Sequence, residues 1–191
     1  YIMRTSKIKR KTNETDVKVY LTLDGKGDYK IDTGIKFFDH LLSSFSRHGN
    51  FDIIVKAIGD NEHHIVEDVA ISIGKAFLDA LTDKCGIKRF GSAIIPMDDI
   101  LILTAIDMSG RGYCVNNVKF RRKKIEGLSS EMIGHFITTF AMDSKINIHT
   151  KIIEGKNEHH KAEALFKSLG LSLKDACKVV GKEIPSTKGV L

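Results

Sequence analysis

The sequence contains no tryptophan, only two prolines and only three cysteines. Cys85, Cys114 and Cys177 lie far apart and form no Cys-x-x-Cys pair, which argues against a disulfide framework and against a thiolate zinc site. We expect them to be small buried hydrophobic residues in a reducing compartment. No apolar run approaches the roughly 20 residues of a membrane-spanning helix, so no membrane partner is expected.

Charge of one sign is not concentrated over any long stretch. The chain carries 30 Lys and Arg against 24 Asp and Glu, and its densest basic run is Arg121-Arg122-Lys123-Lys124. Because no aromatic residue interrupts this run, a solvated loop is favoured over contact with an anionic small molecule or partner, and no nucleic-acid partner is expected. The basic start lacks the apolar segment of a signal peptide, which favours the cytoplasm, or a plastid if a transit peptide preceded Tyr1.

One seven-residue phrase occurs twice, as Asn61–Glu67 and as Asn157–Glu163, each reading Asn-Glu-His-His-x-x-Glu. Residues four apart share one face of a helix, so His63 lies with Glu67 and His159 lies with Glu163. The adjacent His64 and His160 point roughly 100° away around the helix axis. A single His-His pair is more often a solvated or capping feature, but its recurrence favours metal binding.

The order of predicted elements also repeats, within a length of 191 residues that suits one compact domain built from two halves. Each half reads strand-strand-helix-strand-helix, and we expect the strands to form hairpins and the amphipathic helices to pack on sheets, in an α+β fold. The first helix of each half is expected to carry one inward-facing histidine, His40 or His135. The expected halves are 1–90 and 91–191, the second with a C-terminal tail. The expected elements are strands 16–23, 29–33, 51–58, 100–108, 113–120 and 145–153, a connecting strand 89–95, and helices 37–49, 61–85, 129–141 and 157–181.

Six histidines and two glutamates therefore recur in matched positions and predict two metal sites. By the duplication, His64 joins His159 and Glu163, while His160 joins His63 and Glu67. The periodicity does not decide which metal takes His40 and which takes His135. Nitrogen and oxygen ligands suit a Mn²⁺-like ion, although Fe²⁺, Co²⁺ or Zn²⁺ would accept the same donors. His48 and His149 have no counterparts and are expected at the surface or behind the ligands.

From about residue 10 to residue 191 the chain resembles the imidazoleglycerol-phosphate dehydratases, enzymes of histidine biosynthesis. The doubled histidine motif and the tail, in this order, carry the resemblance. The segments that match are Asn13-Glu14-Thr15, Leu23-Asp24-Gly25, Thr33-Gly34-Ile35, Phe37-Phe38-Asp39-His40, His63-His64 with Glu67-Asp68, Pro96-Met97-Asp98, Asp107-Met108-Ser109-Gly110-Arg111, His135-Phe136, His159-His160 with Glu163-Ala164, and Pro185-Ser186-Thr187-Lys188-Gly189.

The resemblance implies a helical bundle between two sheets, as in the second domain of ribosomal protein S5, and a homo-oligomer of 24 subunits with sites at subunit boundaries. It implies two Mn²⁺ per chain, one bound by His40, His64, His159 and Glu163 and the other by His63, Glu67, His135 and His160. It implies substrate binding by Glu14, His40 and a phosphate-anchoring group, with Glu14, His64 and His160 catalytic. The phosphate-anchoring group comprises Arg89, Arg111, Ser186, Thr187 and Lys188.

The implied reaction is the dehydration of D-erythro-imidazole-glycerol phosphate to imidazole-acetol phosphate. Two metals that bind the ring as imidazolate explain how the poor leaving group and the weakly acidic C2 hydrogen are both overcome. The chain departs from the family pattern at Gly112, Ile65 and Gly134 and in a shorter loop before His63. The competing hypotheses are another dimetal hydrolase acting on a phosphorylated small molecule, and a basic nucleic-acid-binding module with structural histidines.

Overall fold

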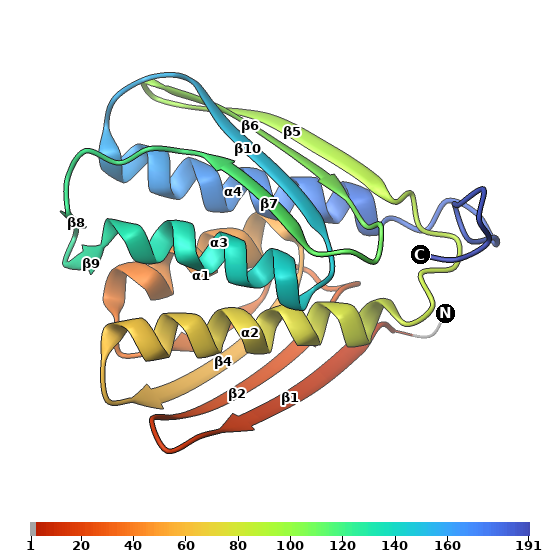
Figure 1. Cartoon of the computed structure of the whole chain (residues 1–191), viewed down its shortest axis with the longest axis horizontal. Helices are drawn as coiled ribbons and strands as arrows, with labels where there is room; N and C mark the ends of the chain where they lie inside the picture. The colour runs from red at the N-terminus through yellow and green to blue at the C-terminus, as the bar shows by residue number, and fades with distance from the viewer. Residues whose placement is uncertain (1–2) are drawn as a thin grey trace.

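The computed structural model describes residues 3–191, and in it two four-stranded sheets enclose a layer of helices (Figure 1). The first sheet has the order β1-β2-β4-β3. In it β2 pairs antiparallel with both β1 and β4, whereas β3 runs parallel to β4 at the edge. Its strands are β1 (Thr5–Lys11), β2 (Thr15–Thr22), β3 (Tyr29–Asp32) and β4 (Asp52–Gly59).

The second sheet repeats this topology in the order β5-β6-β10-β7, again with the third strand of the unit parallel at one edge. A two-stranded hairpin, β8 (Lys124–Ile125) with β9 (Leu128–Ser129), is an addition that has no counterpart in the first half of the described chain. The strands of the second sheet are β5 (Phe90–Met97), β6 (Ile100–Asp107), β7 (Tyr113–Asn117) and β10 (Asn147–Glu154).

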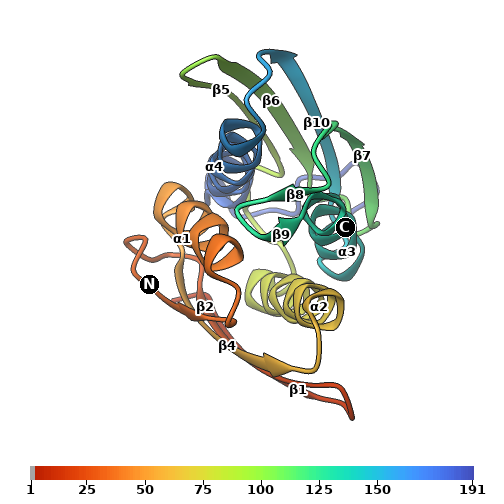
Figure 2. The same ribbon diagram turned by 90° about the vertical axis from the view of Figure 1, so that its left-hand side faces the viewer.

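The helices form the middle layer, and they pair across the two halves (Figure 2). Helix α1 (Lys36–Gly49) packs on α4 (Glu158–Cys177), and α2 (Glu62–Leu81) packs on α3 (Ser130–Asp143). Each pair therefore contains one helix from either repeat. The α+β class and the placement of the helices between two sheets are as the sequence predicts.

A glycine permits close approach in each helix pair. Gly74 and Gly170 each lie 11 residues after the first histidine of their motif. A Cβ on Gly74 would lie 2.9 Å from Asp143 Cβ of α3, and one on Gly170 would lie 2.5 Å from the Phe45 carbonyl oxygen of α1. The duplication therefore preserves both the ligand motif and the point where its helix touches a neighbour.

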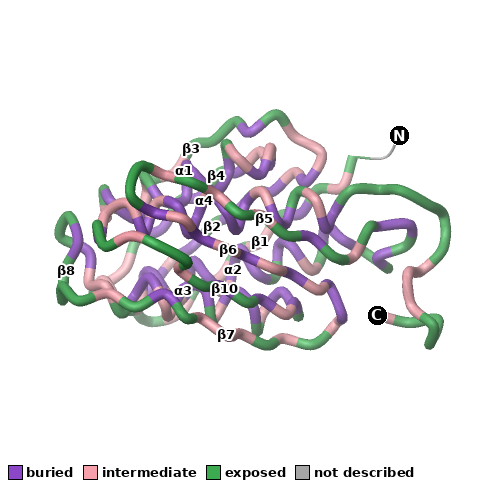
Figure 3. Tube along the Cα trace, turned by 90° about the horizontal axis from the view of Figure 1, so that it is seen from above, coloured by how far each residue is buried: buried purple, intermediate pink, exposed green. Residues whose placement is uncertain are grey.

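Alternating burial on the strands and a cluster of phenylalanines build the core. On β2, Val17, Val19 and Leu21 are buried while the side chains between them face outward. Between the sheets, Phe45, Phe77 and Phe140 pack edge-to-face or tilted, with ring centroids 5.4 to 6.2 Å apart. Figure 3 shows the purple buried trace in the middle of the molecule and a largely exposed C-terminal segment.

The expected hairpins are wrong. Neither β3 nor β7 pairs back on the strand before it; each crosses to pair parallel with β4 or β10. Asp52 fixes the first crossover, because its Oδ1 accepts hydrogen bonds from Lys26 N and Asp28 N in the intervening loop. The strand that does pair antiparallel at the start of each unit is β1 or β5. The sequence patterns predicted no element for the basic segment that contains β1, and they predicted β5 only as a connecting strand.

Two smaller expectations also need correction. Helix α4 ends at Cys177 rather than near residue 181, because Lys178 leaves helical geometry with ψ 127. Cys85 is exposed and its Sγ hydrogen bonds to the Lys182 carbonyl oxygen, whereas Cys177 is buried as expected. No helix within residues 3–191 is both long and apolar enough to cross a membrane.

Candidate metal centre

Both histidine motifs begin their helices in the same way. The side-chain oxygen of Asn61 accepts a hydrogen bond from His64 N at 3.0 Å, and that of Asn157 accepts one from His160 N at 3.2 Å. An asparagine N-cap satisfies an amide that the first turn leaves free. The asparagine of the motif is thus the start signal of the helix, and it places both His-His pairs in the first turn.

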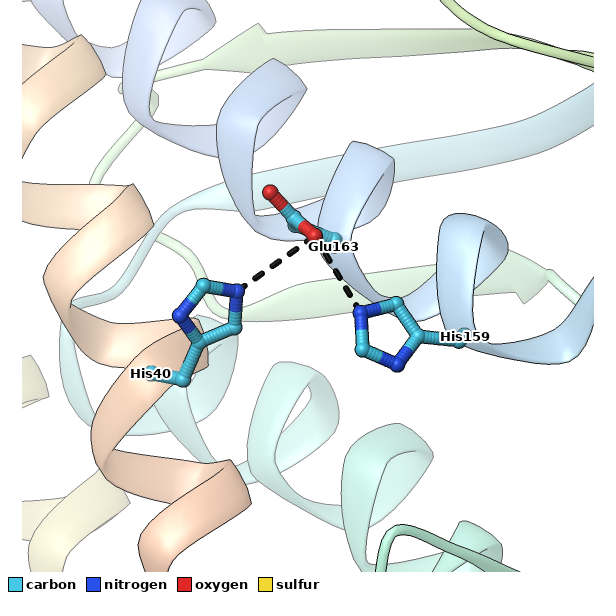
Figure 4. A group of neighbouring side chains, drawn as sticks. All are labelled: His40, His159 and Glu163. Atoms are coloured by element: carbon cyan, nitrogen blue, oxygen red, sulfur yellow. Dashed lines mark ion pairs between the residues drawn. The ribbon is translucent and has the colours of Figure 1, made fainter.

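The first donor group joins α1 to α4 (Figure 4). His40 Nε2 and His159 Nε2 each lie 3.4 Å from Glu163 Oε2, and all three side chains point toward one another. The ring of buried Phe37 packs against His159 with centroids 5.0 Å apart, which supports the imidazole from one side. We call these three donors the α1/α4 group.

The second donor group joins α2 to α3. His135 Nε2 lies 3.2 Å from Glu67 Oε1, and the rings of His63 and His135 have centroids 5.0 Å apart. We call these three donors the α2/α3 group. In each group the ligand atoms lie within 4.8 Å of one another. The structure therefore brings His40 to Glu163 and His135 to Glu67, the choice that periodicity had left open.

The two carboxylates sit in different surroundings. The Glu163 side chain is 12% exposed, and its Oε1 forms an ion pair with Lys167 Nζ at 2.8 Å. Desolvation raises the pKa of Glu163, but the hydrogen bonds from Lys167 and His40 outweigh it, so the net pKa is lowered. The Glu67 side chain is 38% exposed, and within residues 3–191 its ion-pair partner is His135 alone.

Within residues 3–191, His64 and His160 belong to neither group. A metal site built from one chain alone would therefore lack the ligand that the duplication predicts from each of them. Their side chains are 28% and 27% exposed, near the starts of α2 and α4. Each group consequently offers three donors to an ion. The donor set of two imidazoles and one carboxylate, converging within 4.8 Å, fits a divalent metal such as Mn²⁺, Fe²⁺ or Zn²⁺.

Sequence reasoning missed the motif glutamates Glu62 and Glu158. Glu62 Oε1 accepts a hydrogen bond from Ser129 N at 3.0 Å, at the entrance to α3. Glu158 Oε2 accepts one from Arg121 N at 2.6 Å, and its Oε1 pairs with buried Lys161 at 2.7 Å. Both glutamates thus fasten the segment 119–129 to the metal-binding helices. Their recurrence within the repeated phrase was the available signal.

The basic run lies at the same end of the molecule. Arg121, Arg122 and Lys124 are exposed and line a hollow of about 380 Å³ beside His159, together with Lys156. Glu158 holds the backbone of the run, so the arginine side chains remain turned to solvent. This agrees with the expectation of a solvated loop.

The residues predicted to anchor phosphate gather at the opposite end. Arg89 pairs with Asp107 at 2.7 Å and donates to the Pro185 carbonyl oxygen at 2.9 Å, which ties the tail to β5. Ser186 Oγ accepts from Lys188 N at 3.2 Å, while Thr187 and Lys188 are exposed. Exposed Arg111 follows Gly110, whose backbone lies against Leu191.

This end is far from the donor groups of the same chain. Arg89 N donates to the Ala176 carbonyl oxygen near the end of α4, whereas Glu163 lies in the second turn of that helix. At 1.5 Å per residue the helix separates them by about 20 Å. Glu14, in contrast, lies at the metal end, with Oε2 3.6 Å from His64 Nδ1.

Of two glycines that depart from the family pattern, Gly112 has a structural explanation and Gly134 has none. A Cβ at Gly112 would lie 2.6 Å from Met142 Cα, so the loop before β7 runs too close to the end of α3 for a larger residue. At Gly134 a Cβ would meet only Asn116 Nδ2 at 3.4 Å, so a side chain is tolerated there.

The comparisons with known proteins agree on one family. The family model for imidazoleglycerol-phosphate dehydratase matches residues 33–173. The imidazoleglycerol-phosphate dehydratases of Caldicellulosiruptor bescii and Methanocella arvoryzae are 50% and 51% identical, over 98% and 99% of this chain and 98% and 100% of theirs. The crystal structure of the Pyrococcus furiosus enzyme in complex with (S)-C348 has a TM-score of 0.85 at 35% identity, covering 96% of this chain and 100% of that one. The Staphylococcus aureus enzyme also gives 0.85, at 29% identity, covering 92% and 99%.

Proposed function

Since the chain belongs to the imidazoleglycerol-phosphate dehydratase family, a family of hydro-lyases in histidine biosynthesis, we propose that it dehydrates D-erythro-imidazole-glycerol phosphate to imidazole-acetol phosphate at a two-metal site. The two three-donor groups are the observation that carries the two-metal part of the proposal. We propose Mn²⁺ for both positions because the family resemblance implies it, and a set of imidazoles and a carboxylate accommodates this ion as it does Fe²⁺ or Zn²⁺.

Each active site is shared between copies of the chain. His64 and His160 are exposed donors outside the groups of their own chain, so they complete the α1/α4 group and the α2/α3 group, respectively, of a neighbouring copy. The phosphate anchors lie about 20 Å from Glu163 along α4, a span that the three-carbon chain of the substrate cannot bridge within one subunit. A closed homo-oligomer, of 24 subunits in this proposal, supplies both ends to one substrate.

The residues of the chain then divide the work. Metal ions held by the α1/α4 group and the α2/α3 group would supply positive charge, and this charge would lower the pKa of the N–H group of the substrate imidazole. Arg89, Arg111 and Lys188, with the hydroxyls of Ser186 and Thr187, bind the phosphate dianion through charge-assisted hydrogen bonds and fix the position of the diol. Exposed Glu14, next to His64, takes the proton from C2 as general base, and the C3 hydroxyl leaves as hydroxide. The proton and the hydroxide together make up the water that is lost, and the resulting enol tautomerises to the ketone of imidazole-acetol phosphate.

Complementation between two inactive variants tests the shared site. His64→Ala removes the donor that is lent, and Glu163→Ala removes the group that receives it, so each variant alone should be inactive. Mixed after metal removal and reassembled with Mn²⁺, some sites combine an intact Glu163 with an intact His64 from the other variant. We expect product formation, followed as imidazole-acetol phosphate, to return in the mixture.

In the control, each variant alone is taken through the same metal removal and reassembly, which restores no complete site. Native mass spectrometry shows whether the two variants share particles, and metal analysis counts two ions per wild-type chain. Co-assembled particles that stay inactive would mean that each site forms within a single chain.

A further inference from the structure

The second histidine of each motif is held by a carboxylate on its Nδ1 side. In the first half, Asp60 Oδ1 lies 2.8 Å from His64 Nδ1, and Glu14 Oε2 lies 3.6 Å from the same atom. Asn61 Nδ2 lies 2.9 Å from His64 Nδ1 as well. A carboxylate only accepts and an amide NH₂ only donates, so these two neighbours favour opposite tautomers of the ring.

In the second half, Asp99 Oδ1 lies within hydrogen-bond distance of His160 Nδ1, at 3.1 Å. Asp98 Oδ2 lies 3.4 Å from Nε2 of the same ring, as an ion-pair contact without hydrogen-bond geometry. This carboxylate is itself fixed, because Oδ2 accepts hydrogen bonds from Lys156 N at 2.8 Å and Asn157 N at 3.0 Å. Those two bonds, with the contact to His160, hold the pKa of Asp99 well below its usual range. Asp99 therefore joins the turn between β5 and β6 to the start of α4.

The two carboxylates do not descend from one position of the repeat. Asp60 immediately precedes the first motif, and the residue that immediately precedes the second motif is Lys156. The turn between β5 and β6, which carries Asp99, corresponds to the turn between β1 and β2, which carries Glu14, and each turn brings a carboxylate near Nδ1 of the second histidine. The repeat therefore accounts for Glu14 and Asp99, whereas Asp60 is an additional carboxylate at Nδ1 of His64 and lies closer to it than Glu14 does.

We propose that Asp60 and Asp99 are positioning residues that keep the proton of His64 and His160 on Nδ1. The lone pair of Nε2 is then available to bind a metal ion. The proposal rests on the proposed function, in which these two histidines complete the metal sites of a neighbouring copy. A metal-bound imidazole commonly donates its other N–H to a carboxylate, which fixes the ring and makes it a better ligand. In three histidines of the two groups, His40, His135 and His159, Nε2 lies beside the glutamate of the group, and at His159 the other nitrogen, Nδ1, lies 3.6 Å from Glu126 Oε1.

The tautomer itself is measurable without any metal. Metal-free protein labelled with ¹⁵N-histidine is studied by long-range proton–nitrogen correlation, at a pH above the imidazole titration, with His64→Gln and His160→Gln to assign the signals. We expect both neutral rings to carry the proton on Nδ1. In Asp60→Asn the His64 ring should shift to the Nε2–H form, because amide groups of residues 60 and 61 then donate to Nδ1. Asp60→Glu should restore the Nδ1–H form.

Manganese affinity provides a second readout. Asp60→Asn and Asp99→Asn should each weaken binding of one of the two ions by about 10–100-fold and leave the other unchanged. Glu154→Gln is the matched control, since Glu154 is exposed at the end of β10 and its loss removes one negative charge near Asp99. Asp99→Asn should have the larger effect, because Asp99 also holds Lys156 N and Asn157 N.

The outcomes separate this inference from the proposed function. A wild-type chain without metal affinity would overturn the two-metal function, and the tautomer would still decide the roles of Asp60 and Asp99. Wild-type rings with the proton on Nε2 would overturn the inference. So would two-ion binding that neither aspartate variant weakens more than Glu154→Gln.

Discussion

The α1/α4 group and the α2/α3 group each contain two histidines and one glutamate, yet the two glutamates differ in solvent exposure and in their ion-pair partners. Glu163 is 12% exposed and paired with Lys167, whereas Glu67 is 38% exposed and lies near His135. The residue that occupies the position of Lys167 in the first repeat, four residues after the glutamate, is Ile71. Duplication set where the ligands lie, and later substitution around them set how each carboxylate is stabilised.

The difference also concerns how each pair of helices is held. The α1/α4 group has Phe37 against His159, while in the α2/α3 group the imidazoles of His63 and His135 face each other directly. The helices of the α2/α3 group are also joined by a hydrogen bond, because Glu62 of α2 accepts one from Ser129 N at the start of α3. Two donor groups of the same composition thus have different structural supports.

The largest expected effect comes from removing either carboxylate. Glu163→Gln and Glu67→Gln should each lower the metal content from two ions per chain to one and reduce turnover by more than the ~10–100-fold seen for outer-shell partners. If both ions are required, the two variants are equally inactive although the sites are unequally buried. Metal analysis with steady-state kinetics checks this, and an active single-ion variant would show that one group is only structural.

The second prediction separates both donor groups from the opposite end of the chain. Lys188→Ala should raise KM through loss of one charge-assisted contact, about 1.5–3 kcal/mol or roughly 10–100-fold, because Lys188 is exposed and has no role in the core. The metal content should stay at two ions. Lys182→Ala, another exposed lysine of the tail, is the control; equal KM values in the two variants would remove Lys188 from the phosphate anchor.

The third prediction concerns the helix crossings under the two groups. Gly74→Ala and Gly170→Ala should each destabilise the fold by about 1–3 kcal/mol, since overpacking forces the paired helices apart. Gly170→Ala should cost more, because its Cβ meets a backbone oxygen at 2.5 Å rather than a side chain at 2.9 Å. Gly134→Ala, with room for a methyl group, should be stabilising by up to about 1 kcal/mol. Denaturant unfolding of the three variants would contradict the packing argument if all behaved alike.

Much of the site could be predicted from the sequence, because its signals are local. The helix period places His63 with Glu67, and an asparagine cap starts each helix, so the motif alone specifies two of the three donors in each group. The partner His40 or His135 comes from another helix, and its choice depends on which helices pack together, which periodicity does not encode. For the same reason Asp99, remote in sequence from His160, gave no signal.

The sequence predicted the wrong partners for two strands, β3 and β7. Turn residues between 24 and 27, and again between 109 and 112, favour a hairpin, yet β3 and β7 cross over to the far edge. Tertiary contacts outweighed the local preference for a tight turn. Among them are the hydrogen bonds that Asp52 accepts from the backbone of Lys26 and Asp28 in the first loop. The helices, whose amphipathic pattern is long, were predicted to within a few residues.

The smallest expected effect tests the lysine that distinguishes the two groups. Lys167→Met removes a cation 2.8 Å from Glu163, so Mn²⁺ affinity at the α1/α4 group should rise severalfold at neutral pH, in line with about 1 kcal/mol for a partly exposed pair. The net lowering of the Glu163 pKa keeps this carboxylate ionised, and able to bind metal, to lower pH. Without Lys167 that pKa rises, so affinity should fall at a higher pH during acidification, and the wild-type and variant curves should cross.

Ile71→Lys is the reciprocal change and completes the argument. It places a lysine four residues after Glu67, on the same helix face, as Lys167 stands to Glu163. Affinity at the α2/α3 group should fall severalfold at neutral pH, and its loss on acidification should begin at a lower pH than in wild type. Ile71 is only partly buried, so a lysine stem can be accommodated with its ammonium in solvent. Calorimetric Mn²⁺ titrations across the pH series decide it. If neither substitution shifts its own group relative to the other, the lysine is a surface ion pair, and the inequality of the two carboxylates arises from burial alone.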